Sequence, residues 1–485
     1  MPNGFAYLML LIWPLVCLWL FRKLPLRRAL IWSILGGYLF LPPLAEFNLP
    51  LVPSMDKVSI PNLSVVLILM FSLKEKLHIW PKNWIGRFLL AGLVLSAIPT
   101  VMTNRDPILF EVLRDAAPII FLVDQLPGQS IRDVGAVVLS QVLTLVPFLL
   151  ARQYLSDEKG LHEVLLAFMV GGLIYSIPSL FEIQFSPVTN IWIYGFFQHS
   201  FEQMIRDGGY RPIVFLPHGL WLAIFVVTSL ISAAALVRNG PPEKRIKGYL
   251  IVGYLAVLLV LCKSLASFAY GVALTPVALF IPSRWQIRLA VVFAVVAVGY
   301  PMLRNLDVIP TEAILAQAAE ISDERAESLA YRFNNEDQLL VRAAEKPAFG
   351  WGGWGRSLVR HSETGEILTV PDGRWIIVFG TFGWVGYICE FGLLALPLLM
   401  MGLYVSRQRP QAVSPFMAPL CLILGVTLMD MLLNATLTPL TWLTAGAIMG
   451  HAEKLFAGVA NPPRYQMQDT VLGKTRQNQG KRTVL

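Results

Sequence analysis

Charged residues are scarce in this sequence. Asp, Glu, Lys and Arg make up 14% of its 485 residues, whereas hydrophobic residues make up 55%. A soluble domain carries about 25% charged residues, because water must hydrate its surface. The composition therefore excludes disordered and fibrous proteins and almost every soluble enzyme. It predicts an all-α polytopic membrane protein.

Cysteine is also rare, and its placement excludes some kinds of site. The four cysteines lie in or beside apolar runs, at Cys17, Cys262, Cys389 and Cys421. Their spacing matches neither a disulfide framework nor a zinc site, so we expect buried or lipid-facing thiols and no metal. The sequence has no Walker-type glycine loop, which argues against an ATP-driven pump. We expect no cofactor.

Long apolar runs are present along most of the chain. A helix needs roughly 20 apolar residues to cross about 30 Å of hydrocarbon. We therefore expect about 13 transmembrane helices, within a range of 12–14. The runs lie near residues 5–21, 29–45, 60–73, 84–101, 134–151, 161–181, 213–236, 248–262, 265–282, 286–303, 380–404, 415–433 and 436–453.

The basic residues predict an orientation. A net charge of +8 would suggest nucleic-acid binding in a soluble protein, but in a membrane protein it reflects basic cytoplasmic loops, so we expect no nucleic-acid partner. Arg22 and Lys23 follow the first apolar run instead of preceding it, which argues against a cleavable signal. The interpretation is a multi-pass membrane protein with its N-terminus on the outer side and its C-terminus in the cytoplasm.

This orientation divides the chain into six parts. We expect N-terminal helices over 1–181, a first periplasmic loop over 182–212, central helices over 213–303, a large periplasmic loop over 304–379, C-terminal helices over 380–456 and a disordered cytoplasmic tail over 457–485. The stretch 108–133 mixes charged and apolar residues, so we interpret it as an interfacial or re-entrant segment on the outer side. Long loops in compact proteins are usually functional or disordered.

The larger loop contains the pattern of an amphipathic helix. Leu329, Phe333, Leu340 and Ala344 fall near one helical face, and Pro347 ends the pattern. We therefore expect this loop to be partly helical.

Four arginines are candidate diphosphate ligands. Arginine stays charged and binds phosphate oxygens in a fork. Arg211 and Arg332 lie in the outer loops close to predicted membrane boundaries, and Arg206 and Arg325 are weaker candidates. The alternative for each is a solvated or ion-paired surface arginine.

Other side chains in these loops could act on a sugar. Asp372, His361 and His218 are candidate general bases, although a carboxylate before glycine is often a turn residue and a histidine can be a core residue. Trp351 and Trp354 could stack on sugar rings, or they could belong to the aromatic belt of the membrane interface.

Three charges lie in or near apolar runs, at Lys263, Glu390 and Asp430. A charge at the bilayer centre costs at least about 2.5–3.5 kcal/mol on insertion scales. We therefore expect each of them to face a cavity or a partner.

The order of motifs in the large loop resembles the O-antigen ligase and O-antigen polymerase superfamily. The resemblance covers roughly residues 160–450 and depends on the order of the motifs more than on any one residue. The matching elements are Tyr331-Arg332, Leu339–Ala344, Pro347–Gly352, Asp372–Trp375 and Gly380–Gly386, with Gly209–Phe215 upstream.

The resemblance implies a membrane glycosyltransferase-like fold and a function on the periplasmic face. Members use an undecaprenyl-diphosphate-linked glycan as donor. Ligases pass it to a lipid acceptor, and polymerases pass it to another lipid-linked unit. The resemblance implies that the protein lies in the bacterial inner (cytoplasmic) membrane and that Arg211 and Arg332 clamp the diphosphate. Trp375 is a further candidate for sugar binding. Ligases carry histidine where this chain has Asp372, so the base stays open between Asp372, His361 and His218.

The expected function is therefore metal-independent, inverting transfer of the glycan to a saccharide acceptor, which would polymerise exopolysaccharide or O-antigen repeat units. A chain-length regulator is a possible partner. One alternative is ligation to a lipid or protein acceptor. From other classes, the chain could be a transporter or flippase of lipid-linked saccharide, or a structural membrane subunit. We find no sequence repeat between the two halves, which argues against a transporter.

Overall fold

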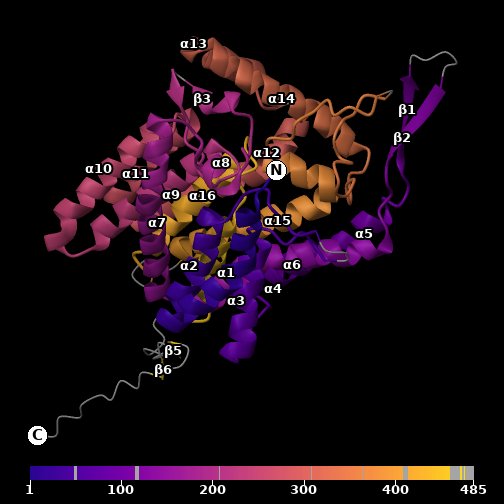
Figure 1. The fold of residues 1–485 in the computed structure, drawn as a ribbon. Helices are drawn as coiled ribbons and strands as arrows, with labels where there is room; N and C mark the ends of the chain where they lie inside the picture. The colour runs from indigo at the N-terminus through magenta and orange to yellow at the C-terminus, as the bar shows by residue number, and fades with distance from the viewer. Residues whose placement is uncertain are drawn as a thin grey trace, which may run out of the picture.

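The computed structural model is mostly helical (Figure 1). It describes residues 1–48, 52–114, 120–206, 208–306, 308–362, 364–407, 413–458, 470–471 and 474–475. The tail predicted over 457–485 therefore lies almost wholly outside the described residues.

The first half of the chain contributes helices that pack against one another around apolar side chains. They are α1 (Gly4–Lys23), α2 (Leu26–Phe40), α3 (Ser59–Leu67) with a π-helical continuation (Ile68–Ser72), α4 (Trp84–Leu95), α5 (Ala97–Met102), α6 (Ile131–Tyr154), α7 (Glu158–Gln184) and the short α8 (Thr189–Tyr194).

The second half adds further helices, some of them in the large loop. They are α9 (Gly219–Asn239), α10 (Arg245–Leu261), α11 (Leu265–Phe280), α12 (Ser283–Asn305), α13 (Thr311–Ile321), α14 (Asp323–Ala344), α15 (Arg374–Arg407), α16 (Met417–Asp430) and α17 (Pro439–Phe456).

Each expected apolar run overlaps one of these helices, but not all of the helices are long. Among the described residues, seven are long and apolar enough to cross a membrane. They are Gly4–Lys23, Trp84–Met102, Ile131–Tyr154, Glu158–Gln184, Gly219–Asn239, Ser283–Arg304 and Arg374–Arg407. A helical membrane protein is confirmed at this level, while the count of about 13 spans and their orientation stay predictions.

The segment 108–133, which we interpreted as interfacial or re-entrant, contains two strands, and its place relative to a membrane stays a prediction. Strands β1 (Ile108–Arg114) and β2 (Ile120–Leu126) form an antiparallel hairpin in which Ile108 pairs with Leu126. Figure 1 shows it projecting from the helices beyond α5. The all-α expectation is wrong here, because two seven-residue runs rich in β-branched and aromatic side chains fit short strands better than a span.

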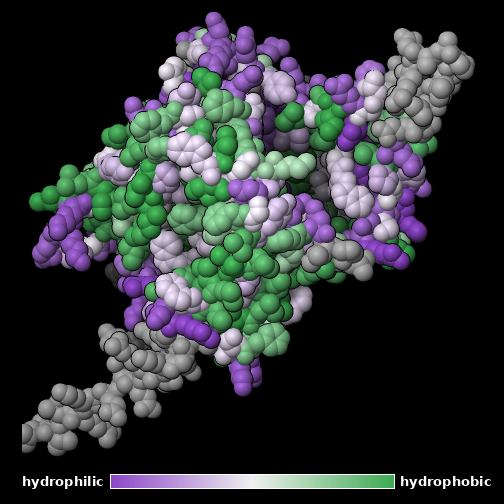
Figure 2. Space-filling model, in the orientation of Figure 1, coloured by the Kyte–Doolittle hydropathy of each residue, from purple (hydrophilic) through white to green (hydrophobic). Residues whose placement is uncertain are grey.

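The amphipathic helix expected in the large loop is present as α14. With α13 it lies over one end of the molecule, where Figure 2 shows hydrophilic residues, while hydrophobic residues cover much of the visible helical body. Phe333, Leu339 and Ala343 are buried on its inner face. Ala344, which we had placed on that face, is exposed, and its neighbour Ala343 is buried instead.

The two glycine-rich motifs of the sequence lie against each other. The backbone N–H groups of Trp351 and Gly352 donate to the carbonyls of Gly380 and Thr381, at 2.8 and 2.9 Å. A Cβ on Gly350 would lie 2.5 Å from the backbone of Thr381, so only glycine permits this contact. These glycines therefore admit a second stretch of backbone.

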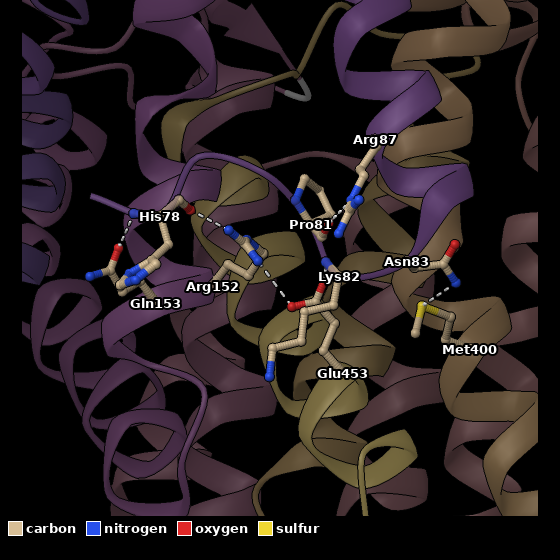
Figure 3. Close-up of polar contacts among 9 residues, drawn as sticks. All are labelled: His78, Pro81, Lys82, Asn83, Arg87, Arg152, Gln153, Met400 and Glu453. Carbon is tan, nitrogen blue, oxygen red and sulfur yellow. Dashed lines mark hydrogen bonds and ion pairs between the residues drawn. The ribbon is translucent and has the colours of Figure 1, made fainter. Parts of the chain in front are cut away.

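The connection between the π-helical turn and α4 is fastened to two distant helices (Figure 3). Arg152 of α6 pairs with Glu453 of α17 at 3.0 Å and also donates to the carbonyl of His78. Glu453 accepts a further bond from the backbone N–H of Lys82, at 2.6 Å. Both ion-paired side chains are buried, so removing either partner would leave an uncompensated charge.

Candidate active site

His218 lies at the centre of a cluster of ionisable side chains from separate loops. It caps α9, and its Nδ1 accepts the backbone N–H of Leu220 at 3.0 Å. Its Nε2 lies 3.3 Å from Oε1 of Gln203. Because Nδ1 is the acceptor, Nε2 carries the proton toward Gln203, and the ring is neutral.

The pKa of His218 is lowered by burial and by neighbouring charges. Burial is the largest cause that lowers the pKa of His218 from its ordinary 6.5 to about 3. The charges of His199, Arg211, Arg332 and Arg206 lower it further. These side chains therefore lie within electrostatic reach of one ring, although Arg211 and Arg332 are far apart in the sequence.

Arg211 is buried and lies on the first loop of the cluster. Its Nη2 donates to the carbonyl of Lys263, at 2.7 Å, in the turn between α10 and α11. A Cβ on Gly219 would lie 2.4 Å from Cδ of Arg211, so glycine at the start of α9 leaves room for the guanidinium stem. Arg211 is 3% exposed, so it can contact only a ligand that enters the cluster.

Two buried charges hold the chain between Arg211 and His218. The carboxylate of Glu182 accepts the backbone N–H groups of Ile213 and Val214, both at 2.8 Å. The ammonium of Lys57 donates to the carbonyl of Phe215 at 2.8 Å. Two uncharged side chains complete the set. The hydroxyl of Tyr175 accepts the backbone N–H of Phe215 at 2.9 Å, and Nε2 of Gln198 donates to the carbonyls of Val214 and Leu216. Together these side chains satisfy the backbone groups of the segment and fix its path.

Arg332 and Asp372 form the other half of the cluster. Arg332 lies on α14, and its Nε is 3.7 Å from Oδ2 of Asp372. Both side chains are partly exposed, at 25% and 34%, so this pair remains accessible to a ligand. Burial raises the pKa of the Asp372 carboxyl above its ordinary value, while the charges of Arg332 and His199 act in the opposite direction.

The backbone on both sides of Asp372 is held in place. Oδ1 of Asn335, on α14, accepts the backbone N–H of Val370 at 2.7 Å. A Cβ on Gly373 would lie 2.4 Å from the carbonyl of Leu432, so the chain passes closely over the connection between α16 and α17. The backbone is therefore held on both sides of Asp372, at Val370 and at Gly373.

His199 is a member of the cluster that the sequence did not reveal. Its ring packs against His218 with centroids 4.4 Å apart, and the charge of Asp372 acts on it. Burial lowers its pKa below the ordinary 6.5, which the charge of Asp372 partly offsets. No spacing in the sequence connects His199 with Asp372, since the two lie on different loops.

The two weaker arginine candidates both lie on or contact the first turns of α14. Arg206 pairs with Glu324 of α14 at 3.3 Å. Arg325 is two turns before Arg332, and seven residues correspond to nearly the same helical face. Arg325 therefore lies near the face of α14 that carries Arg332, and Arg206 reaches the start of α14 through Glu324.

His361 belongs to another part of the structure. It is exposed and forms a tight turn, in which its Nδ1 accepts the backbone N–H of Thr364 at 3.3 Å. This turn packs on the β1–β2 hairpin, because a Cβ on Gly365 would lie 3.2 Å from the ring of Phe110. Asp372 and His218 both belong to the cluster around Arg332. The contacts described for His361 are with its own turn and not with that cluster.

The tryptophans have three different environments. Trp375 is fully buried, and its Nε1 donates to Glu336 at 3.1 Å. The sugar-binding role that we expected for Trp375 stays a prediction, and its burial at the start of α15 argues against it. The guanidinium of Arg342 covers Trp351 at 3.4 Å. Trp354 is 57% exposed and keeps a ring surface for a ligand.

The charges near apolar runs all have partners. Glu390 forms two bonds with Arg374, at 2.7 and 2.6 Å. Asp430 accepts bonds from Asn434 and Thr436, and the charge of Arg332 also acts on it. Lys263 donates to the carbonyl of Arg206 at 2.6 Å.

Comparisons with known proteins do not place this chain in a family. No family model matches the chain. No curated protein matches it either.

Proposed function

We propose that this protein transfers a glycan from a lipid-linked diphosphate donor to a saccharide hydroxyl, and that it polymerises repeat units. The observation that carries the proposal is the convergence of Arg211, Arg332 and Asp372 around His218. These residues supply cations for a diphosphate and one carboxylate with a raised pKa. The motif order resembling the O-antigen ligase and polymerase superfamily supports the same chemistry.

In the proposed reaction, the acceptor oxygen forms a bond to the anomeric carbon as the bond to the diphosphate oxygen breaks. The electron pair of the broken bond goes to the diphosphate, whose added charge Arg332 and Arg211 stabilise. The hydroxyl proton goes to the carboxylate of Asp372. Attack from the face opposite the leaving group inverts the anomeric carbon.

Asp372 suits the role of base better than His218 does. A catalytic base works best when its pKa is near the working pH. The raised pKa of Asp372 moves it toward neutral pH, whereas a pKa of about 3 makes His218 a weak base. The Nδ1 of His218 also caps α9, so His218 is a positioning residue in this proposal.

The test is a transfer assay with the full chain in lipid nanodiscs. The substrate is an undecaprenyl-diphosphate-linked oligosaccharide, and mass spectrometry measures the products. We expect Arg332→Ala to reduce transfer by at least a hundredfold, as loss of one charge-stabilising group commonly does (about 10²–10³). The matched control is Arg245→Ala, which removes an exposed arginine at the start of α10. Normal product lengths with Arg332→Ala at a normal protein level would reject the diphosphate clamp.

Cells lacking the protein distinguish the alternatives. Loss of polymer with retention of single lipid-linked repeats supports a polymerase. Accumulation of full-length lipid-linked polymer supports a ligase instead, and repeats trapped on the cytoplasmic face support a flippase.

A further inference from the structure

A second cationic groove lies at the base of the β1–β2 hairpin, with a volume of about 460 Å³. Three arginines line it, at the end of α14 and on the loop that follows: Arg342, Arg356 and Arg360. Arg342 is ten residues beyond Arg332, which places it about 15 Å farther along α14. The groove is therefore distinct from the cluster around His218.

The positive charge of this groove is only partly neutralised. Arg342 pairs with Glu345 at 2.7 Å. Arg356 is 2% exposed and donates to the carbonyls of Pro127 and Asp106, which are uncharged acceptors. Burial lowers the pKa of Arg356, and the charge of Arg342 lowers it further.

Two donor atoms at the groove have no partner in the part of the chain that the structure describes. They are Nε of Arg356 and Nε of Arg360, and both are buried. A buried donor left unpaired destabilises the folded protein, and more so when it is charged. An oxyanion in the groove would reduce the repulsion among the three arginines and would offset the cost of these buried, unpaired donors.

Apolar side chains complete the lining. Ile108, Phe110 and Leu358 contribute to it, and the guanidinium of Arg360 lies 5.9 Å from the ring centroid of Phe110. Trp354 is exposed on the same loop, between the glycine motif and Arg356. Guanidinium forks beside flat apolar surfaces suit a sugar ring that carries a carboxylate, because the ring has both an anionic edge and apolar faces.

We propose that this groove binds a carboxylate-bearing saccharide, as part of the acceptor or growing glycan. The identification of the ligand as acceptor rests on the proposed function, whereas the binding itself does not. The loop that lines the groove continues to Val370, which α14 holds beside Asp372. An acidic glycan bound here would approach the base along this loop.

Binding of a defined acidic oligosaccharide tests this proposal. The full chain is placed in phosphatidylcholine nanodiscs, and calorimetry measures binding of trigalacturonate, with neutral maltotriose for comparison. We expect trigalacturonate to bind at least tenfold more tightly than maltotriose, with an affinity that falls as salt increases. Arg360→Gln should weaken it about tenfold or more, since one bond to a charged group contributes about 1.5–3 kcal/mol. Arg245→Gln is the matched control and should bind like wild type.

Three results would overturn the proposal. The first is equal binding of the two oligosaccharides. The second is undiminished trigalacturonate binding by both Arg360→Gln and Arg342→Gln, each folded with a wild-type thermal midpoint. The third is a result in which the arginine variants lose only their retention of phosphatidylglycerol in mixed-lipid nanodiscs. That result would assign the groove to a lipid headgroup.

Measuring binding and transfer in the same variants distinguishes a failure of this proposal from a failure of the proposed function. Arg332→Ala should retain trigalacturonate binding while it loses transfer. Binding with no transfer in any variant, wild type included, would reject the proposed function and leave the groove as an acidic-glycan site. Transfer without acidic-glycan binding would reject the groove and leave the proposed function intact.

Discussion

At the scale of single residues, burial decides which candidates can do chemistry. His218 and Trp375 are both polar aromatic side chains near the site, but their polar atoms already bond to the protein. Asp372 and Arg332 form only a long ion pair and remain partly exposed. A ligand can therefore compete for these two, whereas it would have to break a helix cap to use Nδ1 of His218.

The first prediction separates capping from catalysis at His218. Asparagine is also a good N-cap, so His218→Asn should retain most transfer activity, whereas His218→Ala should lose about 1 kcal/mol of stability with the cap. Transfer assays and thermal unfolding measure the two effects. A loss of transfer in a stable His218→Asn protein would show that the imidazole itself is the base.

The same residue predicts a pH dependence of stability. The pKa of His218 is lower in the folded protein than its ordinary 6.5. Its contribution to stability is therefore complete above pH 6.5 and decreases as the pH falls below that value, because the unfolded chain binds the proton first. Thermal midpoints at pH 7.5 and pH 5 should differ less in His218→Asn than in wild type. An equal difference in both proteins would contradict this assignment.

A further prediction concerns Asp372. The carboxylate must be ionised to accept a proton, and its pKa lies above the ordinary 3.8. Transfer by wild type should therefore decrease on the acidic side of a pH profile. Asp372→Asn should reduce the rate by about 10²–10⁴, and its residual rate should lack that acidic limb. A persistent acidic limb in Asp372→Asn would assign it to another group.

At the scale of elements, the shape of α15 brings distant charges together. Arg374 and Glu390 are sixteen residues apart, which would separate them by about 24 Å in a straight helix, yet they share two hydrogen bonds. Gly383 interrupts the helix with φ 65° and ψ −165°. The chain bends there, and Arg374 returns beside Glu390.

The bend predicts a specific sensitivity at Gly383. This backbone conformation is nearly restricted to glycine, and a Cβ would lie 2.4 Å from the backbone of Ala348. Gly383→Ala should therefore destabilise the protein by about 1–3 kcal/mol or more, measured as a lower thermal midpoint. Gly253→Ala is the control, because no atom lies within 4 Å of its added Cβ. Equal midpoints for the two variants would contradict the bend.

At the scale of the whole molecule, the proposed function requires one orientation in the membrane. The cluster around His218 draws on the loop before α9 and on the loop between α12 and α15, so both loops lie at the same end of the molecule. The lipid-linked donor and this end must therefore face the same compartment. The exposed turn at His361 belongs to the same large loop as Arg332 and Asp372. The α9–α10 connection follows the opposite end of α9 from His218.

Cysteine labelling tests this orientation directly. The four native cysteines are buried, so wild type should react little with a membrane-impermeant maleimide. Ser362→Cys should be labelled in intact spheroplasts, because Ser362 is exposed in the outer turn. Glu243→Cys, in the α9–α10 connection, should be labelled only after lysis. The reverse pattern would place the candidate site in the cytoplasm.

The sequence by itself determined where the apolar helices lie and that α14 is amphipathic. These features depend on composition and on helical periodicity, which are local properties of the chain. The sequence also provided Arg211, Arg332 and Asp372 as candidates, because their side-chain chemistry suits a diphosphate and a hydroxyl.

Only the tertiary structure decided which of these residues meet. The place of His199 beside His218, the burial of Trp375 and the groove at Arg356 depend on contacts between segments that are distant in sequence. The β1–β2 hairpin also escaped prediction, since a short apolar run fits a strand or a helix until its neighbours are known. Local patterns fix an element and one of its faces, and packing alone fixes what that face contacts.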